Sequence, residues 1–528
     1  HVQLFTHIYQ LKLIPPTGNK MKILDCTLRD GGYYTNWDFD SNIVDTYIKG
    51  MNNLPIDYLE VGYRNKPTEE YLGKFGYTPV SVLRHLRSIS TKKLVVMLNE
   101  KSTKVEDLED LLVPIQGLAD MVRIAIDPKN FDRALTLAKS VKELGFEVGF
   151  NTMYMSKWNE YEGFIDKLGQ LDDVVDLFCM VDSFGGVTPQ DVKDIFQKVR
   201  EKTACPIGFH GHNNLQLGLI NTLTAIECGA DYVDATILGM GRGAGNLNME
   251  LLLTYLNKEG INLDFNVLGD VITAFIPLYK EYHWGTNLPY MISGANSIPQ
   301  KEVMEWVTNR TYSFNSIVRA LDNRKKHLED NAHYPILQIQ PISKVLLVGG
   351  GNSCIHHMEA IKEYINKNPT MPIIFVTARH AALFADNSNP KYYCLVGNEA
   401  KRMEANVSAE HFEGTCILPP YPRTMGTEVP NFAEKYTFEL KEITFTKSYT
   451  DSCTTVALQT ALCLGATEVD VVGYDGYKGQ VLSEKEMALS NENRTIFEDF
   501  KKGNIVILRS LTPSMYKALN IKSIYQFL

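Results

Sequence analysis

Two residue pairs, far apart in the chain, have the chemistry to bind a metal ion and an anion beside it. Arg29 and Asp30 follow an apolar run and precede two glycines, while His210 and His212 flank a single glycine. Carboxylate and imidazole groups bind divalent cations, and a guanidinium holds carboxylate or enolate oxygens with two parallel hydrogen bonds. Each pair by itself is also consistent with structural side chains, so a metal site is predicted only if the fold brings the pairs together.

Eight short apolar segments alternate with amphipathic ones between residues 21 and 240, which predicts parallel strands joined by crossover helices. Eight such repeats close a (β/α)8 TIM barrel, an α/β fold whose active site lies at the carboxyl ends of the strands. An open doubly wound sheet is the alternative, and eight regular units disfavour it. The expected strands are Ile23–Leu28, Tyr58–Tyr63, Leu94–Leu98, Met121–Ile126, Glu147–Met153, Leu177–Val181, Ile207–Gly211 and Tyr232–Leu238.

This strand pattern places both residue pairs at the same end of the barrel. Residues two apart in a strand share a face, so His210 and His212 are expected to point at one spot near Asp30. The glycine-rich loop 239–246, GMGRGAGN, follows the eighth strand. Such a loop can cradle a phosphate, but its last residue, Asn246, also offers an oxygen ligand. The combination predicts a divalent metal with open coordination positions.

Five motifs together resemble the DRE-TIM metallolyase superfamily over about residues 22–300, closest to its 4-hydroxy-2-oxovalerate aldolase branch. Members make or break a carbon–carbon bond through a metal-stabilised enolate, here expected to be that of a pyruvate-like 2-oxo acid that combines with an aldehyde. The motifs are TLRDG at Thr27–Gly31, EVG at Glu60–Gly62, DSFGGVTP at Asp182–Pro189, GFHGHNNLQLG at Gly208–Gly218, and GMGRGAGN.

The resemblance implies a role for each matching residue. Arg29 would stabilise the enolate oxygen, and Glu60 would orient Arg29 or a metal ligand. No organic cofactor is required by this chemistry. The implied ligands of Mn²⁺ or Mg²⁺ are Asp30, His210, His212 and Asn246.

The chain departs from the family pattern beside the metal-binding Asp. Where the synthases carry a Glu-Gln pair, this chain has Gly32-Tyr33, and where the aldolases place a histidine it has Tyr33. Tyr33 is therefore a candidate catalytic acid or base. Residues 284–290 resemble the C-terminal helical segment of the aldolase branch, from which a tyrosine reaches the active site. The resemblance implies a second candidate, Tyr290, which is equally consistent with an ordinary packing aromatic. The alternative functions are an acyl-CoA-dependent Claisen lyase or synthase, and a non-catalytic barrel that serves only as a scaffold.

The second half of the chain predicts another domain. We expect a leader or tag at 1–20, the barrel at 21–270, a helical extension and linker at 271–340, and a Rossmann-like domain at 341–528. The stretch KVLLVGGGNS from Lys344 to Ser353 reads as a strand and a glycine-rich turn that open a doubly wound sheet. No acidic residue for a dinucleotide ribose follows the next strand, so simple NAD binding is not expected.

This half weakly resembles DUF115 or pterin-pyrophosphokinase-like proteins and bacterial sialyltransferases. The resemblance implies a site for a nucleotide or a nucleotide-linked sugar, and joined to an aldolase it suggests synthesis of an acidic sugar for a surface polysaccharide. An idle domain used for association is the alternative. The implied nucleotide-binding residues are Gly349, Gly351, Asn352, Ser353 and Asp475.

Composition narrows the remaining classes. The chain has 528 residues, 44% of them hydrophobic, and a net charge of −9 with dispersed Lys and Arg, so no nucleic-acid surface is expected. No apolar run approaches the ~18 residues of a membrane helix. Nine cysteines without paired spacing favour free thiols in the cytoplasm. Because related barrels associate, we expect a homodimer.

Overall fold

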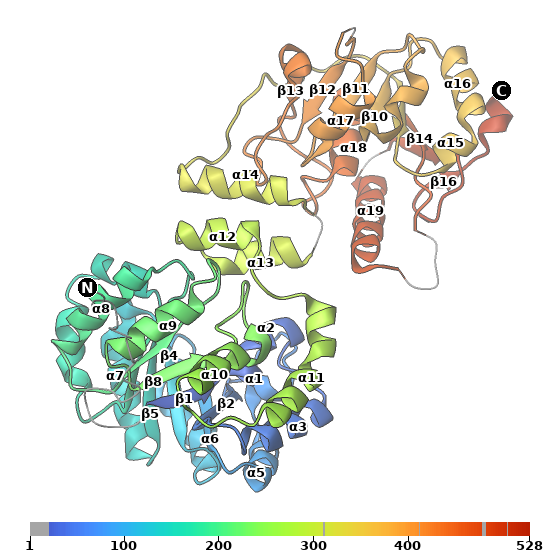
Figure 1. Cartoon of the computed structure of the whole chain (residues 1–528). Helices are drawn as coiled ribbons and strands as arrows, with labels where there is room; N and C mark the ends of the chain where they lie inside the picture. Colours follow the sequence, from blue (N-terminus) through green and yellow to red (C-terminus); the bar gives the residue numbers. More distant parts are fainter. Residues whose placement is uncertain (1–20, 310–311, 411, 478–481, 504) are drawn as a thin grey trace, which may run out of the picture. The chain divides into compact units, whose positions relative to one another are not determined.

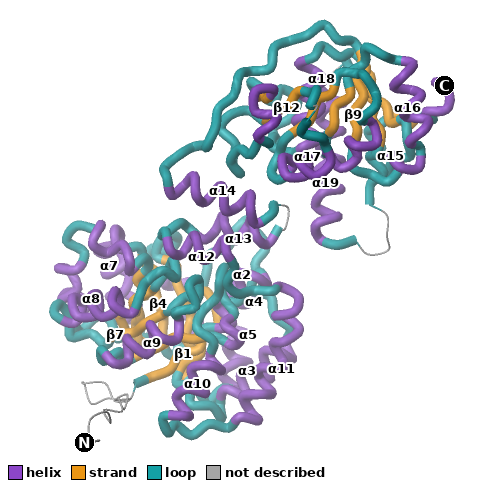
Figure 2. The backbone as a smooth tube through the Cα atoms, turned by 45° about the horizontal axis from the view of Figure 1, so that its top comes forward, coloured by secondary structure: helices purple, strands orange, loops and turns teal. Residues whose placement is uncertain are grey.

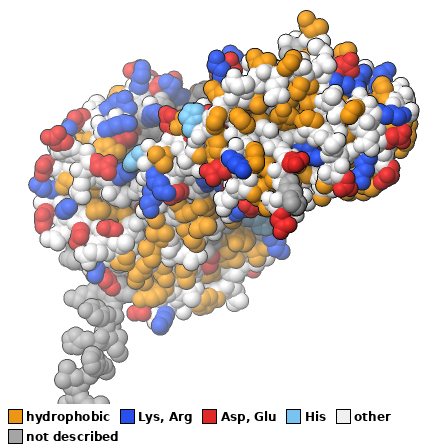
Figure 3. Space-filling model, turned by 90° about the horizontal axis from the view of Figure 1, so that it is seen from above, with side chains coloured by type: hydrophobic (Ala, Val, Ile, Leu, Met, Phe, Trp, Pro, Cys, Tyr) orange, Lys and Arg blue, Asp and Glu red, His pale blue; other side chains and the backbone are white. Residues whose placement is uncertain are grey.

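The structure is a computed structural model that describes residues 21–528 except 310–311, 411, 478–481 and 504. The expected leader at 1–20 lies outside the described residues. The chain forms two compact units, divided between Met304 and Glu305. Among the described residues, no helix is long and apolar enough to cross a membrane. On the face shown in Figure 3, acidic and basic side chains are interspersed.

The first unit is a closed barrel of eight parallel strands that follow one another in chain order. Figure 2 draws these strands in orange. The barrel closes where β1 pairs with β8, with Lys22 opposite Tyr232 and Asp25 opposite Ala235. This confirms the predicted TIM barrel. The strands are β1 Lys22–Asp25, β2 Tyr58–Tyr63, β3 Lys93–Asn99, β4 Met121–Ile126, β5 Glu147–Thr152, β6 Leu177–Val181, β7 Ile207–His210 and β8 Tyr232–Ala235.

Helices cover the outside of the barrel (Figure 1) and bury their apolar faces against its strands in one continuous core. Local capping sets where several begin: Asp40 accepts hydrogen bonds from the first backbone amides of α3, and Thr188 with Pro189 opens α8. The long helices are α3 Ser41–Met51, α5 Val80–Ile89, α7 Phe131–Glu143, α8 Pro189–Arg200, α9 Gly218–Glu227, α10 Met249–Lys258 and α11 Phe265–Tyr282. The shorter helices are α1 Thr27–Asp30, α2 Gly32–Thr35, α4 Lys74–Tyr77 and α6 Leu108–Leu112; α12 Leu288–Ala295 follows the barrel, and the division between the units falls within α13 Gln300–Thr308.

The first strand ends three residues earlier than the predicted Ile23–Leu28. Asp25 closes β1, and its carboxylate accepts a hydrogen bond of 2.8 Å from the backbone amide of Thr27. This contact turns the chain into the single helical turn α1. Arg29 and Asp30 therefore project from a helical turn at the mouth of the barrel and not from the end of a strand.

The second unit contains an eight-stranded parallel sheet in the order β13-β12-β11-β10-β9-β14-β15-β16. The order reverses between β9 and β14, which is the arrangement of a doubly wound sheet. Alternate residues of β9 enter different apolar cores: Val345 and Leu347 one, Leu346 and Val348 the other. Its strands are β9 Lys344–Val348, β10 Ile373–Phe375, β11 Lys391–Cys394, β12 Thr415–Leu418, β13 Thr437–Glu439, β14 Glu468–Val472, β15 Ile507–Ser510 and β16 Asn520–Ile521.

Each core of this unit is completed by helices on one face of the sheet. Ile361 and Ile365 of α16 join one core, and Val456 with Phe497, from α18 and α19, join the other. Beyond α14 the predicted linker contains no further helix among its described residues, up to the start of β9. The helices are α14 Phe314–Lys325, α15 Ser353–His356, α16 Met358–Lys367, α17 Glu399–Asn406, α18 Cys453–Cys463 and α19 Glu484–Gly503.

Candidate active site

Arg29 is buried at the mouth of the barrel and is held by two carboxylates. Its Nε donates to Oε1 of Glu60 on β2 at 2.6 Å, and its Nη1 donates to the carboxylate of Asp30. Its remaining nitrogen, Nη2, is buried and has no hydrogen-bond partner among the described residues. The predicted partnership of Arg29 with Glu60 thus fixes the guanidinium and leaves one donor free for another oxygen.

Asp30 remains ionised in this setting. Burial by itself would raise the pKa of Asp30, but the charge of Arg29, together with His210 and His212, lowers it to about 2. Asn246 donates from Nδ2 to Oδ2 of Asp30 at 2.8 Å. The amide oxygen of Asn246 is buried and finds no donor in the described part of the chain. Asp30 and Asn246 therefore bring a carboxylate and a free amide oxygen to one point.

His210 is the last residue of β7, and its ring lies between two carboxylates. Nδ1 is 2.9 Å from Oδ2 of Asp234 on β8, and Nε2 is 3.5 Å from Oδ2 of Asp30. When Nδ1 donates to Asp234, Nε2 keeps a lone pair beside the carboxylate of Asp30. Two electron-pair donors at this separation favour a cation between them, and a carboxylate on the far nitrogen is the usual support of a metal-binding histidine.

His212 lies beyond the end of β7, where it forms an isolated bridge with Asn246. The prediction that both histidines project from one strand is therefore wrong, although their rings are 4.9 Å apart. Nδ1 of His212 lies 2.7 Å from the carbonyl oxygen of Asp182, which can only accept a hydrogen bond. Burial, followed by the neighbouring His210, lowers the pKa of His212 to about 3. The ring is thus neutral, with a lone pair on Nε2.

Sequence reasoning missed Cys26, whose Sγ lies with ligand atoms of Asp30 and His210 in a group within 4.8 Å of one another. Burial, then the Asp30 carboxylate, raises the pKa of this thiol well above its ordinary value. A protonated thiol is a poor ligand for a hard divalent cation, which prefers oxygen and imidazole nitrogen. Cys26 therefore fits a wall of the site better than a ligand of Mn²⁺ or Mg²⁺.

Sequence reasoning also missed Arg123, which is fully buried in the barrel interior. Its Nη2 donates to Oδ2 of Asp234 at 2.7 Å, and its Nη1 is 3.4 Å from Oε2 of Glu60. Burial by itself would lower the pKa of Arg123, but Asp234 and Glu60 outweigh it and raise the pKa. The sequence did contain a signal for Arg123, which is a charged residue inside the apolar strand MVRIAI. Such residues are almost never buried unpaired, so a buried partner could have been expected.

These contacts close a ring of charged side chains around the barrel axis, which we call the charged ring. It links the supports of Arg29 to those of His210 without a break. The ring contains three carboxylates and two guanidinium groups. Its carboxylates are therefore in excess, and a bound cation would offset this excess of negative charge. The donor set therefore fits a divalent metal. The members of the charged ring are Arg29, Asp30, His210, Asp234, Arg123 and Glu60.

The two candidate tyrosines have different surroundings. Tyr33 Oη is 3.2 Å from Oη of Tyr63. Burial and then Tyr33 raise the pKa of Tyr63, and the charge of Arg29 opposes this rise. Tyr290 is buried on α12, and within the described residues its recorded neighbours include Tyr34 and Gly243. Burial raises the pKa of Tyr290, so its hydroxyl remains a proton donor. Tyr33 is therefore linked through Tyr63 to the surroundings of Arg29 and Asp30, whereas the hydroxyl of Tyr290 lies next to Tyr34.

In the second unit, the glycine-rich turn after β9 packs against the end of β14, where the strand order reverses. The amide of Gly351 donates to the carbonyl of Gly473 at 2.8 Å, and a Cβ on Gly351 would lie 2.6 Å from Oδ1 of Asp475. Asp475 accepts hydrogen bonds from the amide and hydroxyl of Ser353. The structure thus brings the predicted Gly349, Gly351, Ser353 and Asp475 together, next to Asn352, and fills the anion position of the turn with a carboxylate of the chain itself.

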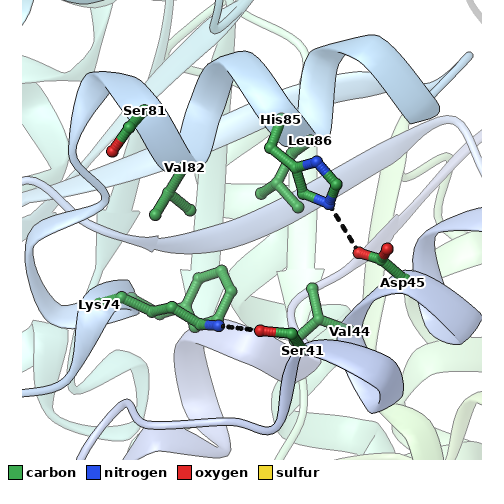
Figure 4. A pocket seen from close by; sticks show the side chains of 9 residues that line it. Ser41, Val44, Asp45, Lys74, Ser81, Val82, His85 and Leu86 are labelled. Carbon is green, nitrogen blue, oxygen red and sulfur yellow. Dashed lines mark hydrogen bonds and ion pairs between the residues drawn. The ribbon is translucent and has the colours of Figure 1, made fainter.

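A pocket of about 180 Å³ lies away from these residues, between α3, α4 and α5 on the outside of the barrel (Figure 4). Its charged and imidazole side chains are already paired: His85 with Asp45 at 2.8 Å, and Lys74 with Ser41 at 2.9 Å. The pocket is a surface feature unconnected with the charged ring.

The barrel is similar in sequence to known proteins. The HMGL-like family model matches residues 121–271. The 4-hydroxy-2-oxovalerate aldolase of Carboxydothermus hydrogenoformans is 34% identical over 251 residues, which are 46% of this chain and 72% of that protein. An oxaloacetate decarboxylase of Mycobacterium tuberculosis is 28% identical, over 47% of this chain and 73% of its own length.

A solved structure, the N-terminal domain of a putative aldolase from Bacteroides vulgatus, is 71% identical to this chain. The alignment has a TM-score of 0.55 and covers 57% of this chain and all of that one. The closed barrel and these relatives define a carbon–carbon lyase of the aldolase type. The chain belongs to the HMGL-like family of DRE-TIM metallolyases, whose aldolases use a divalent metal.

Proposed function

We propose that the barrel catalyses an aldol reaction between the enolate of a pyruvate-like 2-oxo acid and an aldehyde. The observation that carries this proposal is the charged ring, which brings potential ligand atoms of Asp30 and His210 close to a guanidinium nitrogen that has no partner among the described residues. Asp30, His210, His212 and Asn246 are the proposed metal ligands. A divalent metal held there would polarise the 2-oxo carbonyl and favour loss of a proton from the adjacent carbon.

The residues of the chain supply the remaining contributions. Nη2 of Arg29 would donate to the substrate oxygen that becomes negative, and Glu60 holds the guanidinium so that little reorganisation is needed. Tyr33, hydrogen-bonded to Tyr63, is the hydroxyl we propose for proton exchange with the aldehyde oxygen. Tyr290, buried with its hydroxyl beside Tyr34, would shape the wall of the site and remain protonated.

Exchange of the pyruvate methyl protons in D2O, followed by NMR with Mn²⁺ or Mg²⁺ present, tests this function without any aldehyde. The native protein is expected to catalyse the exchange. Arg29→Ala is expected to lower the exchange rate by about 10²- to 10³-fold, because it removes a donor to the developing oxyanion. The matched control is Arg84→Ala, an exposed arginine on α5. No exchange by the native protein, or equal exchange by Arg29→Ala, would rule the proposal out.

We further propose that the second unit binds a nucleotide or a nucleotide-linked sugar at the reversal between β9 and β14. Crevices at such reversals are the usual ligand sites of doubly wound sheets. Because Asp475 places a carboxylate in the glycine-rich turn, the turn suits sugar hydroxyls better than a phosphate. The exposed Arg379, which donates to the carbonyl of Gly350, suits a phosphate. An aldolase joined to this site would serve the assembly of an acidic sugar.

Calorimetry with CMP and UDP, free and linked to sugars, tests this second site. At least one nucleotide is expected to bind with micromolar affinity, and Asp475→Asn is expected to weaken it about tenfold by removing one charge-assisted hydrogen bond. Asp386→Asn, an exposed acid of the same unit, is the control. Absence of binding at millimolar nucleotide would instead support a purely structural second unit.

A further inference from the structure

Arg242 is a half-buried cation in the loop that follows β8, four residues before the proposed ligand Asn246. Its guanidinium lies 5.5 Å from the centre of the Tyr33 ring. Within the described residues, no hydrogen bond or ion pair is recorded for this guanidinium. A cation–π contact with a ring face uses none of the N–H donors of the guanidinium, so these donors can bind an anion.

This lack of an oxygen partner distinguishes Arg242 from its counterparts. Among described residues 21–304, every other buried or half-buried arginine donates to a carboxylate or a backbone carbonyl. Such pairing is expected, since a cation removed from water is costly unless it is compensated. These paired arginines are Arg29, Arg64, Arg87, Arg123 and Arg200.

The backbone on the carboxyl side of Arg242 is fixed, although its side chain is free. Tyr34 Oη donates to the carbonyl of Gly243 at 2.8 Å, and the amide of Asn213 donates to the carbonyl of Gly245 at 2.8 Å. Gly243 has φ of +62°, a conformation that other residues rarely adopt. The loop is therefore preorganised to present this one charged group, which lowers the entropy cost of binding a ligand.

The position of Arg242 selects which reactant it would bind. The 2-oxo acid is assigned to Arg29 and the metal ligands. The Arg242 guanidinium lies over the ring of Tyr33, whose hydroxyl is hydrogen-bonded to that of Tyr63. Burial raises the pKa of Tyr63, and the charge of Arg29 opposes that rise. Arg242 therefore lies beside Tyr33, the residue to which the proposed function assigns proton exchange with the aldehyde, and its charge also acts on the proposed ligand His212.

We propose that the aldehyde substrate carries a carboxylate or phosphate group that Arg242 binds, an inference that rests on the proposed aldol function. The new bond joins the methyl carbon of pyruvate to the aldehyde carbon. The proton lost from the methyl group is balanced by one gained at the aldehyde oxygen, so the reaction needs no oxidant or reductant. Arg242 makes no contribution to forming the enolate and sets the preference between charged and neutral aldehydes.

Paired aldehydes test this preference, with the rate of pyruvate consumption giving kcat/KM for each. The pairs are glyceraldehyde 3-phosphate with glyceraldehyde, and succinic semialdehyde with pentanal, so that each source of the anion is compared with a neutral analogue. The native enzyme is expected to prefer the charged member of at least one pair by about 30-fold or more, and Arg242→Gln is expected to reduce that ratio about tenfold. Arg242→Lys should give an intermediate ratio.

Lys101→Gln is the matched control, because it removes an exposed charge that follows β3 at the same end of the barrel. It is expected to leave the charged-to-neutral ratio within twofold. A native ratio near one for both pairs, or an unchanged ratio in Arg242→Gln, would overturn the proposal. Failure of the native enzyme to exchange pyruvate protons would instead remove the aldol function on which it rests.

If none of the four aldehydes reacts, the binding of an anionic ligand tests the proposal. Glycerol 3-phosphate, added to the enzyme with metal and pyruvate, is expected to bind the native protein about tenfold more tightly than Arg242→Gln in calorimetry. Equal affinity for the two proteins, or no binding to either, would overturn the assignment of an anionic reactant to Arg242.

Discussion

Replacing His210 by alanine is expected to abolish stoichiometric metal binding and to lower the rate of pyruvate proton exchange by about 10³-fold. The loss corresponds to about 4 kcal/mol of transition-state stabilisation, in the range that a bound metal supplies. His210 is the residue whose Nε2 lies 3.5 Å from Oδ2 of Asp30, so its removal opens the cation site on one side. The metal content of the dialysed protein, measured by atomic emission, and the exchange rate check this expectation together.

His85→Ala is the appropriate control for this experiment. His85 is an exposed histidine on α5 that pairs with Asp45 at 2.8 Å, so removing it alters a histidine without touching the charged ring. Its metal content and exchange rate should match those of the native protein. Retention of one metal per chain with full exchange in His210→Ala would mean that the cation lies elsewhere or takes no part in the reaction.

Replacing Arg123 by methionine is expected to destabilise the first unit by about 3–5 kcal/mol. The substitution removes the cation that faces Asp234 and Glu60, leaving carboxylates in a fully buried place with too little positive charge. The free energy of unfolding, from urea titrations followed by circular dichroism, measures the change. A loss below about 1 kcal/mol would show that these carboxylates do not depend on Arg123.

The pH dependence of that loss identifies its electrostatic origin. Burial by itself raises the pKa of Asp234, but Arg123 and then His210 lower it below its ordinary value. In the native protein the ionised Asp234 thus contributes stability above its unfolded pKa of about 3.9, and this contribution is lost as the pH falls. In Arg123→Met burial prevails and raises the pKa, so the variant loses stability as the pH rises.

The difference in unfolding free energy between native protein and Arg123→Met should consequently widen as the pH rises above the unfolded pKa of about 3.9. A cavity or packing defect would give a difference independent of pH. Lys167→Ala, which breaks an exposed pair with Asp132, serves as the control, and little change in stability is expected because such pairs contribute little.

The barrel illustrates how far local pattern specifies tertiary structure. Short apolar segments alternating with amphipathic ones permit few arrangements, because parallel strands need crossover helices and both faces must be covered. Strands β2, β4 and β6 begin and end at the predicted residues. Strand ends at the mouth were less predictable: the turn at Asp25 depends on a side-chain contact with the amide of Thr27, which hydrophobic periodicity does not encode.

Sequence by itself determined the types of residue that the site uses and the strands after which they follow. Arg29, Asp30, His210, His212 and Asn246 were all identifiable as candidates, because they follow predicted strands whose carboxyl ends meet at one end of a barrel and because their motifs resemble those of the DRE-TIM metallolyases. The sequence could not determine their partners, since a hydrogen bond between residues 31 or 216 positions apart depends on how the barrel closes.

Only the tertiary structure decided that Arg123 and Asp234 complete the charged ring and that the Arg242 guanidinium finds no oxygen partner among the described residues. A buried charge is stable only if opposite charges from distant strands meet it at hydrogen-bond distance. The same residue type is therefore structural at position 123 and available to a ligand at position 242. That distinction arises from which groups surround each guanidinium, and proximity in space is the information that a linear sequence leaves implicit.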